Sequence, residues 1–494
     1  MIVSWRSGGG SLLTQPRGLA TLFLTEMWER FSYYGVRAIL ILFLVTPAAR
    51  GGLGIDDRTA SAILGLYLAG TYVFSLFGGW VADRLIGAQR AVVAGGSIIA
   101  VGNAMLVSGN QAVFFLGLLL NVIGVGLLKP NISALVASLY PEGGSRRDAG
   151  VSIFYMGINC GSFLGALLVP LVAYWAGWHW GFVLTALGML IGLAQFKLTC
   201  RYLGSAGLGI AAETRRGSWL PVIACAAALV LAATFAVTRQ SSLDPVCVAA
   251  AASWLIGLLA AAYFIYLIFF AGIVGPERKR LYVMVALFIA CACFWAGIEQ
   301  IGASFSLFAA RYTDRNILGR EIPAGVLLTV NPIFVIAFSP LFAALWLSLG
   351  KRGKDFSPPA KFAAGLILMG LGFLPMYCAS RYVMAGAKVS PLWLIGTYLL
   401  HTWGELCLSP VGISSMTKLS PSRYIGQIMG MWFLAVALGN NLAGQISGLY
   451  DANDLESLPG LFIRIFWWGV ICGGVLLLLT PGLKRLMDWD ERPH

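Results

Sequence analysis

Residues 25–40, TEMWERFSYYGVRAIL, constrain how the rest of the chain can fold. The middle of this apolar run holds four charged residues, Glu26, Glu29, Arg30 and Arg37. Charge buried at that depth in a bilayer is costly unless it is paired or hydrated. On a helix these residues and Tyr33 form one polar stripe, because successive residues turn by about 100°. We therefore expect the stripe to face other helices or a water-filled cavity. An i,i+4 ion pair between Glu26 and Arg30 with a purely structural role is the alternative.

The composition indicates an integral membrane protein. Of the 494 residues, 59% are hydrophobic and 11% are charged, whereas soluble domains have about 25% charged residues. The net charge of +13 does not indicate nucleic-acid binding, because the Lys and Arg residues are spread over short loops. The nine cysteines are scattered, almost all in apolar segments, and predict neither a disulfide framework nor a metal site.

The apolar segments predict fourteen transmembrane helices. They cover residues 18–47, 59–82, 90–110, 112–139, 149–173, 179–199, 218–238, 246–273, 281–312, 323–349, 359–380, 391–417, 424–449 and 460–483. An even number puts both termini on one side, and assigning that side to the cytoplasm places most Lys and Arg residues in cytoplasmic segments. The N-terminal stretch lacks a clear apolar core and cleavage site, so we expect the first helix to remain in the mature protein.

The first helix also carries a recognisable signature. The pattern ExxERFxYYG, complete from Glu26 to Gly35, resembles the signature of the proton-dependent oligopeptide transporter (POT or PTR) family of the major facilitator superfamily. The resemblance covers all the predicted helices and implies an all-α membrane protein with the major facilitator fold. It implies an N-terminal six-helix bundle (1–201), linkers with an inserted helix pair (202–280) and a C-terminal six-helix bundle (281–494). The implied function is symport of protons with di- and tripeptides, driven by the proton gradient without a cofactor.

The turn after the second helix reads GGWVADRLIGAQR, residues 78–90. Its Asp83, Arg84 and Arg90 resemble the cytoplasmic loop motif of the superfamily, with one extra residue before Gly87. An acid at a helix end and bases across a tight loop can latch neighbouring helices, which predicts a gate. The alternative is a solvated charge cluster at the membrane surface.

Lys129 is predicted to partner the acids of the first helix. It lies about 15 Å from the cytoplasmic end of its helix, and Glu29 lies about 16 Å from the same side, at a rise of 1.5 Å per residue. A carboxylate at equal depth is a closer partner than water. We therefore expect Lys129 to pair with Glu29 or Glu26, and this group, with Arg30 and Glu299, to carry proton coupling.

The distribution of intramembrane charge suits a zwitterionic ligand. The second bundle offers only Glu299 and Glu405, whereas the first bundle holds the cations. We expect a peptide to place its carboxylate near Arg37 and Lys129 and its ammonium near Glu405. Glu299 and Arg37, about 27 and 28 Å along their helices, are also expected to form an outer gate.

Other residues are assigned to the substrate path by the resemblance. They are Tyr33, Tyr34, Tyr67, Asn159, Asn331 and Trp432. Asn159 could instead make an interhelical hydrogen bond, and Trp432 could face lipid. His401 is expected to be a structural hydrogen-bonding residue, and Asp314 with Arg315 is an alternative outer latch.

Rival functions have weaker support in the sequence. A channel would not need acids that change protonation, and His179, His401, His494 and the cysteines form no nucleophile–base or metal constellation for an enzyme. The remaining alternative is the same fold carrying nitrate, another small organic anion or a peptidomimetic. We expect the partners to be peptide, protons and the lipid bilayer, with no nucleic acid and no obligatory protein partner.

Overall fold

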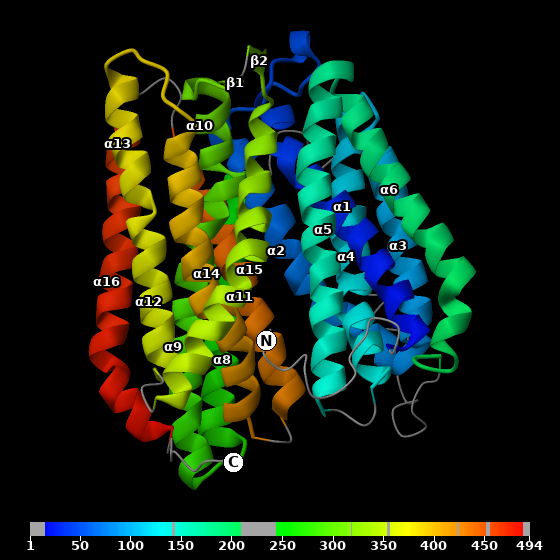
Figure 1. Ribbon diagram of the computed structural model, residues 1–494, viewed down its shortest axis with the longest axis vertical. Helices are drawn as coiled ribbons and strands as arrows, with labels where there is room; N and C mark the ends of the chain where they lie inside the picture. Colours follow the sequence, from blue (N-terminus) through cyan, green and yellow to red (C-terminus); the bar gives the residue numbers. More distant parts are fainter. Residues whose placement is uncertain are drawn as a thin grey trace. The chain divides into compact units, whose positions relative to one another are not determined.

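The structure is a computed structural model that describes residues 15–140, 144–208, 244–317, 319–352, 356–421, 424–450 and 455–487. Almost all of these residues are helical (Figure 1). Nine segments within the described ranges are long and apolar enough to cross a membrane. The helix predicted at 218–238 lies outside the described residues.

The chain divides into two compact units. Unit 1 consists of Met1–Asp56, Gly70–Pro245 and Glu321–Ile336, and unit 2 consists of Asp57–Ala69, Val246–Arg320 and Ala337–His494. Two long helices, α2 (Asp57–Val81) and α11 (Val330–Lys351), contribute residues to both units. The predicted division at residues 201 and 281 remains a prediction.

Unit 1 is built around the charged helix α1, which runs from Arg17 to Val45. Its other elements are η3 (Ala48–Arg50), the second half of α2, the π-helix η4 (Ala82–Ile86), α3 (Ala88–Leu106), α4 (Gln111–Ser138), α5 (Gly144–Ala176), α6 (Trp178–Thr199), η5 (Cys200–Leu203), η8 (Ala324–Thr329) and the start of α11. The helix α1 (Arg17–Val45) packs against α5 and α6, and α3 packs against α4 and α6 (Figure 1). The stripe of charge on α1 is thereby enclosed by protein.

Glycines allow α5 to approach α1 closely. Gly157, Gly161 and Gly165 recur at every fourth residue, which places them on one face of α5. A Cβ atom at Gly161 would lie 2.2 Å from the carbonyl oxygen of Met27, and one at Gly165 would lie 2.3 Å from that of Phe31. Small residues at this spacing let two membrane helices pack backbone to backbone. The contact fixes which face of α1 turns toward α5.

Unit 2 contains the C-terminal helices and the second inserted helix. Its elements are the first half of α2, α8 (Pro245–Ile265), the π-helix η6 (Tyr266–Phe270), α9 (Gly275–Ile298), η7 (Glu299–Gly302), α10 (Ser304–Tyr312), the strands β1 (Asn316–Ile317) and β2 (Arg320–Glu321, whose last residue falls in unit 1), the rest of α11, α12 (Pro358–Leu371), α13 (Phe373–Met384), α14 (Leu392–Leu419), α15 (Ile425–Ser447) and α16 (Ser457–Leu486). Within it α9 packs against α15 and α16, and α12 packs against α14 and α16 (Figure 1).

The helix predicted over 281–312 is not continuous, because the 3₁₀ segment η7 separates α9 from α10. Gln300 lies in this segment and is fully buried. Its amide donates to the carbonyl oxygens of Ala296 (3.3 Å) and of Ala443 in α15 (3.0 Å), and accepts a bond from Ser304 (2.7 Å). The side chain therefore supplies hydrogen bonds at the point where the regular helical ladder is interrupted.

Candidate functional site

The charged residues of α1 form a buried cluster in unit 1. The exposed fractions of Glu26, Glu29 and Arg30 are only 2%, 1% and 4%. The Arg30 Nε atom lies 3.1 Å from Glu26 Oε1 and also donates to Glu29 Oε2. Glu26 Oε2, Glu29 Oε1 and Arg30 Nη2 are buried without a hydrogen-bond partner among the described residues. One guanidinium is thus shared by two carboxylates, which is more than the simple Glu26–Arg30 pair considered from the sequence.

Lys129, the predicted partner of Glu29 or Glu26, lies in α4. Its ammonium is close enough to act electrostatically on the Glu26 carboxylate. The Nζ atom also lies 3.9 Å from the ring centroid of Tyr72 in α2. A cation–π contact of this kind stabilises a half-buried ammonium without neutralising it. The role of Lys129 in proton coupling remains a prediction.

Arg37 lies two turns further along α1, among aromatic rings. Its exposed fraction is 8%, and its guanidinium lies 5.7 Å from the ring centroid of Tyr34. The rings of Tyr33 and Tyr34 meet edge to face at 5.3 Å, and Arg30 lies 5.0 Å from the Tyr33 ring centroid. Tyr33 and Tyr34 therefore make cation–π contacts with Arg30 and Arg37.

The two asparagines assigned to the substrate path occupy different elements of unit 1. Asn159 is 8% exposed and donates to the carbonyl oxygen of Tyr155, one turn back in α5, at 3.0 Å. Its amide N–H thus bonds within its own helix rather than across to a neighbour. Asn331 lies in the first turn of α11 and is half-buried. The predicted substrate contacts of both residues remain predictions.

The acids and the tryptophan predicted from the second half of the chain lie in unit 2. Glu299 opens η7 and is 4% exposed, and Glu405 is half-buried in α14. Trp432 in α15 is buried against Phe362 and fills the space beside Gly412, where an added Cβ would lie 2.0 Å from its ring. It therefore does not face lipid. Tyr67, in the first half of α2, is also buried in unit 2. The expected gate between Glu299 and Arg37 would join residues of different units, and it remains a prediction.

His401 has the structural role expected of it. It is fully buried in α14, and its Nε2 atom lies 3.1 Å from the carbonyl oxygen of Met369. The imidazole stacks on Phe305 and lies beside Phe373, at the junction where α12 gives way to α13. Gly372 makes room for the ring, since an added Cβ would lie 2.2 Å from it. The side chain thus stabilises a helix junction.

The loop predicted as a gate is held by a residue that the motif does not include. Asp83 and Arg84 lie in the π-helix η4, and both are exposed, as is Arg90 in the first turn of α3. The buried Gln89 instead donates to the carbonyl oxygens of Gly204 (3.2 Å) and Ala206 (2.6 Å), just after α6. These bonds attach the start of α3 to the end of the first six helices. The gating role of the three charged residues remains a prediction.

A bidentate ion pair in unit 2 was not anticipated. Arg311, near the end of α10, places Nη1 2.6 Å from Asp57 Oδ2 and Nη2 2.7 Å from Asp57 Oδ1. Its guanidinium also lies 5.6 Å from the ring centroid of Tyr450. The pair joins the start of α2 to the segment of broken helix that follows Glu299. Asp314 and Arg315, the latch considered from the sequence, lie just beyond it.

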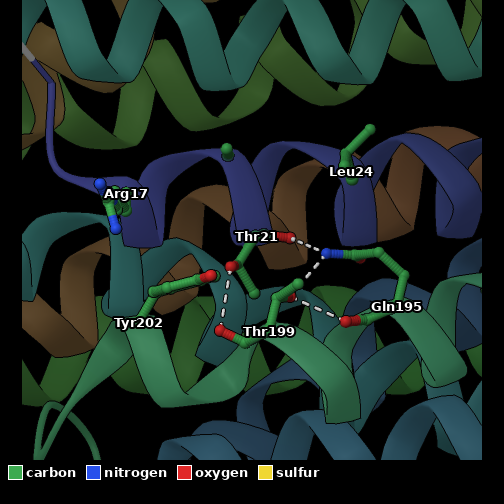
Figure 2. A pocket seen from close by; sticks show the side chains of 7 residues that line it. Arg17, Thr21, Leu24, Gln195, Thr199 and Tyr202 are labelled. Carbon is green, nitrogen blue, oxygen red and sulfur yellow. Dashed lines mark hydrogen bonds between the residues drawn. The ribbon is translucent and has the colours of Figure 1, made fainter. Parts of the chain in front are cut away.

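A small pocket of about 250 Å³ lies between α1 and α6 in unit 1 (Figure 2). It is lined by Arg17, Ala20, Thr21, Leu24, Gln195, Thr199 and Tyr202. None of the predicted site residues lines it.

The sequence analysis did not single out the amide side chains of Gln195, Gln300 and Asn441. They could have been noticed as amides in apolar runs, but their partners are far away in the sequence.

The apolar helices and the buried, paired charges of α1 indicate a multi-pass membrane protein. A family model described as the POT family matches residues 89–462. The chain belongs to this POT family and is therefore a transporter rather than an enzyme.

Several known proteins are similar to the chain over nearly its whole length. A peptide transporter of Yersinia enterocolitica, YePEPT, is 41% identical, with 97% of each chain covered. A di-/tripeptide transporter of Lactococcus lactis is 34% identical, with 96% of this chain and 97% of that protein covered. A crystal structure of a peptide transporter POT with sulfate has a TM-score of 0.89 at 37% identity, covering 97% of each chain. Another POT family structure, in complex with a thioalcohol-conjugated peptide, has a TM-score of 0.87 at 31% identity, covering 96% and 98%.

These likenesses confirm the predicted fold class. The chain is an all-α integral membrane protein with the major facilitator fold of the POT transporters. The predicted count of fourteen helices includes the one at 218–238, which the structure does not describe.

Proposed function

We propose that the protein is a proton-coupled symporter that imports di- and tripeptides by alternating access. The buried cluster of α1 carries the proposal. Two carboxylates share one guanidinium there, and an oxygen of each lacks a hydrogen-bond partner among the described residues. A proton on either carboxylate would leave a one-to-one ion pair with Arg30, so the cluster has two chemically reasonable charge states.

The proposed proton-coupling group consists of Glu26, Glu29, Arg30, Lys129 and Glu299. Lys129 supports it because its ammonium acts on Glu26, so a change in the charge of that carboxylate alters the environment of a second helix. Energy comes from the proton gradient, with no cofactor. A proton bound on one side of the membrane and released on the other would link this charge change to the transport cycle.

For recognition we propose that Arg37 binds the peptide carboxylate and Glu405 binds the peptide ammonium. Arg37 suits the first role because its guanidinium is a buried bidentate donor ordered by Tyr34. Peptide is favoured over nitrate because the similar proteins named above are peptide transporters. In addition, a simple anion has no positive group that the Glu405 carboxylate could bind. We place the protein in the cytoplasmic membrane with both termini in the cytoplasm, which is supported by the distribution of Lys and Arg.

The experiment is uptake into proteoliposomes containing the purified protein. A labelled dipeptide should accumulate inside when the outside is made more acidic, and a protonophore should release it. Empty liposomes and an N-blocked, C-amidated dipeptide serve as controls. Accumulation of nitrate without accumulation of the dipeptide would replace peptide by anion transport, and equilibration without accumulation would remove the proton coupling.

A further inference from the structure

We propose that the pocket between α1 and α6 binds an anionic phospholipid, with the acyl chain inside the pocket and the phosphate at its rim. The pocket is formed by the first two turns of α1, the end of α6 and Tyr202 in η5 (Figure 2). It contains none of the residues assigned to protons or peptide. The proposal therefore concerns a separate site and does not depend on the transported substrate.

The polar residues of the pocket are already satisfied by one another. Thr199 Oγ1 donates to the Gln195 carbonyl oxygen (2.7 Å) and accepts from Gln195 Nε2 (2.8 Å), and Thr21 Oγ1 donates to the Thr199 carbonyl oxygen (3.3 Å). The remaining amide oxygen of Gln195 accepts a bond from Thr25 (3.0 Å). A small polar ligand would have to compete with these bonds. The apolar remainder of the wall, Ala20 and Leu24, suits a hydrocarbon chain instead.

The rim of the pocket has the opposite chemistry. Arg17 and Tyr202 lie there, and the Tyr202 hydroxyl accepts a hydrogen bond from Arg201 Nη2 at 3.2 Å. The Arg201 guanidinium also lies 5.1 Å from the Tyr202 ring centroid. Arg17 and Arg201 are both exposed. Arg17 lines the pocket and Arg201 contacts its lining residue Tyr202, and such exposed guanidiniums can bind a phosphate through charge-assisted hydrogen bonds.

The depth of the pocket fits a lipid headgroup. Arg17 is the first residue of α1, and the apolar segment that contains α6 ends at Leu203. Arginine and tyrosine at the end of a membrane span lie at the level of the phosphates, and basic pockets between helices at this level bind anionic headgroups. An apolar groove with a cationic, tyrosine-bearing rim at this depth matches an amphiphile with a negative headgroup.

The test measures lipid binding to the full-length protein in a neutral detergent, without any transport. Native mass spectrometry and the melting temperature would be followed during titration with phosphatidylglycerol, with phosphatidylcholine of the same acyl chains and with inorganic phosphate. We expect phosphatidylglycerol to bind and to raise the melting temperature. The other two titrants should do neither at the same concentrations.

Two variants separate the rim from the groove. The double variant Arg17→Ala/Arg201→Ala removes the cations, and Ala20→Trp fills the apolar wall; each should weaken phosphatidylglycerol binding at least tenfold. Arg50→Ala, an exposed arginine beyond the other end of α1, is the matched control and should leave binding unchanged. An equal response to phosphatidylcholine, a full response to inorganic phosphate, or binding unaffected by both pocket variants would overturn the proposal.

Discussion

Arg30 is the residue at which the charges of α1 meet. It contacts Glu26, one turn before it, and Glu29, its neighbour in the sequence. Truncating one partner of a buried ion pair leaves the other charge without compensation, which is strongly destabilising. An isosteric change from carboxylate to amide removes the charge and the protonation site but keeps the shape. Such changes are therefore the cleanest test of the cluster.

We expect Glu29→Gln and Lys129→Ala each to abolish uptake driven by a proton gradient. Glu29→Gln removes one of the two carboxylates that can take up the proton, and Lys129→Ala removes the ammonium that acts on the Glu26 carboxylate. Exchange of internal for external peptide needs no net proton movement, so it should persist in both. Glu277→Gln, which changes an exposed acid in the first turn of α9, is the control and should behave like the parent protein. Full gradient-driven uptake in either cluster variant would show that the cluster does not couple protons.

We expect Glu405→Gln to weaken binding of a dipeptide by about 2–5 kcal/mol, because the peptide ammonium loses its charged partner. The N-acetylated form of the same dipeptide lacks the ammonium and should bind parent and variant with similar affinity. Competition for uptake of a labelled peptide measures both affinities. If the variant loses equal affinity for the two ligands, Glu405 does not bind the amino terminus.

At the scale of elements, the inserted helix α8 is attached to α15 by side-chain hydrogen bonds. Asn441 Nδ2 donates to the Ala249 carbonyl oxygen (2.6 Å) and to Ser253 Oγ (2.9 Å), and Gln445 Nε2 donates to Ser253 Oγ (2.7 Å). Between these residues, the carbonyl oxygen of Ala443 accepts the bond from Gln300 in η7. The same turn of α15 thus supports both the inserted helix and the segment that begins at Glu299.

We expect Asn441→Ala to lower the stability of the protein by about 1–2 kcal/mol, the usual size of a polar contact between membrane helices. Ser253→Ala should lower the stability less in the Asn441→Ala variant than in the parent protein, because the variant has already lost one of the bonds to Ser253. Thermal melting of the two single variants and the double variant measures this coupling. Trp254→Phe, on the exposed face of α8, is the control. Strictly additive losses would mean that the Asn441–Ser253 bond does not contribute.

The elements α1, η7 and α15 show which structural features could be predicted from the sequence and which could not. The polar stripe on α1 was predictable because an α-helix repeats at a known period, and the charges could not be left facing lipid. The break at Glu299 was not predictable, since a 3₁₀ segment of four residues hardly changes the pattern of apolar residues. The roles of Gln300 and Asn441 depend on acceptors in other helices, Ala443 and Ala249, which no local pattern indicates.

At the scale of the whole molecule, the orientation depends on where the bases lie. The chain carries 34 Lys and Arg against 21 Asp and Glu, and short loops rich in bases stay in the cytoplasm. We expect a fluorescent protein that folds only in the cytoplasm to be active when fused to either terminus. Alkaline phosphatase, which is active only outside, should be inactive at both positions. Phosphatase activity at both termini would reverse the orientation, whereas activity at only one terminus would change the number of spans from even to odd.

The placement of both acidic partners of Arg30 on its own helix also affects how the protein is made. During synthesis α1 enters the bilayer before α4 has emerged from the ribosome, so Lys129 is not yet available to it. An isolated charged residue at the centre of a helix costs about 2.5–3.5 kcal/mol during insertion by the translocon. Glu26 lies one turn from Arg30 and can pair with it within a single helix. The nascent helix therefore carries its own counter-ions into the membrane, and its insertion does not have to wait for a neighbour.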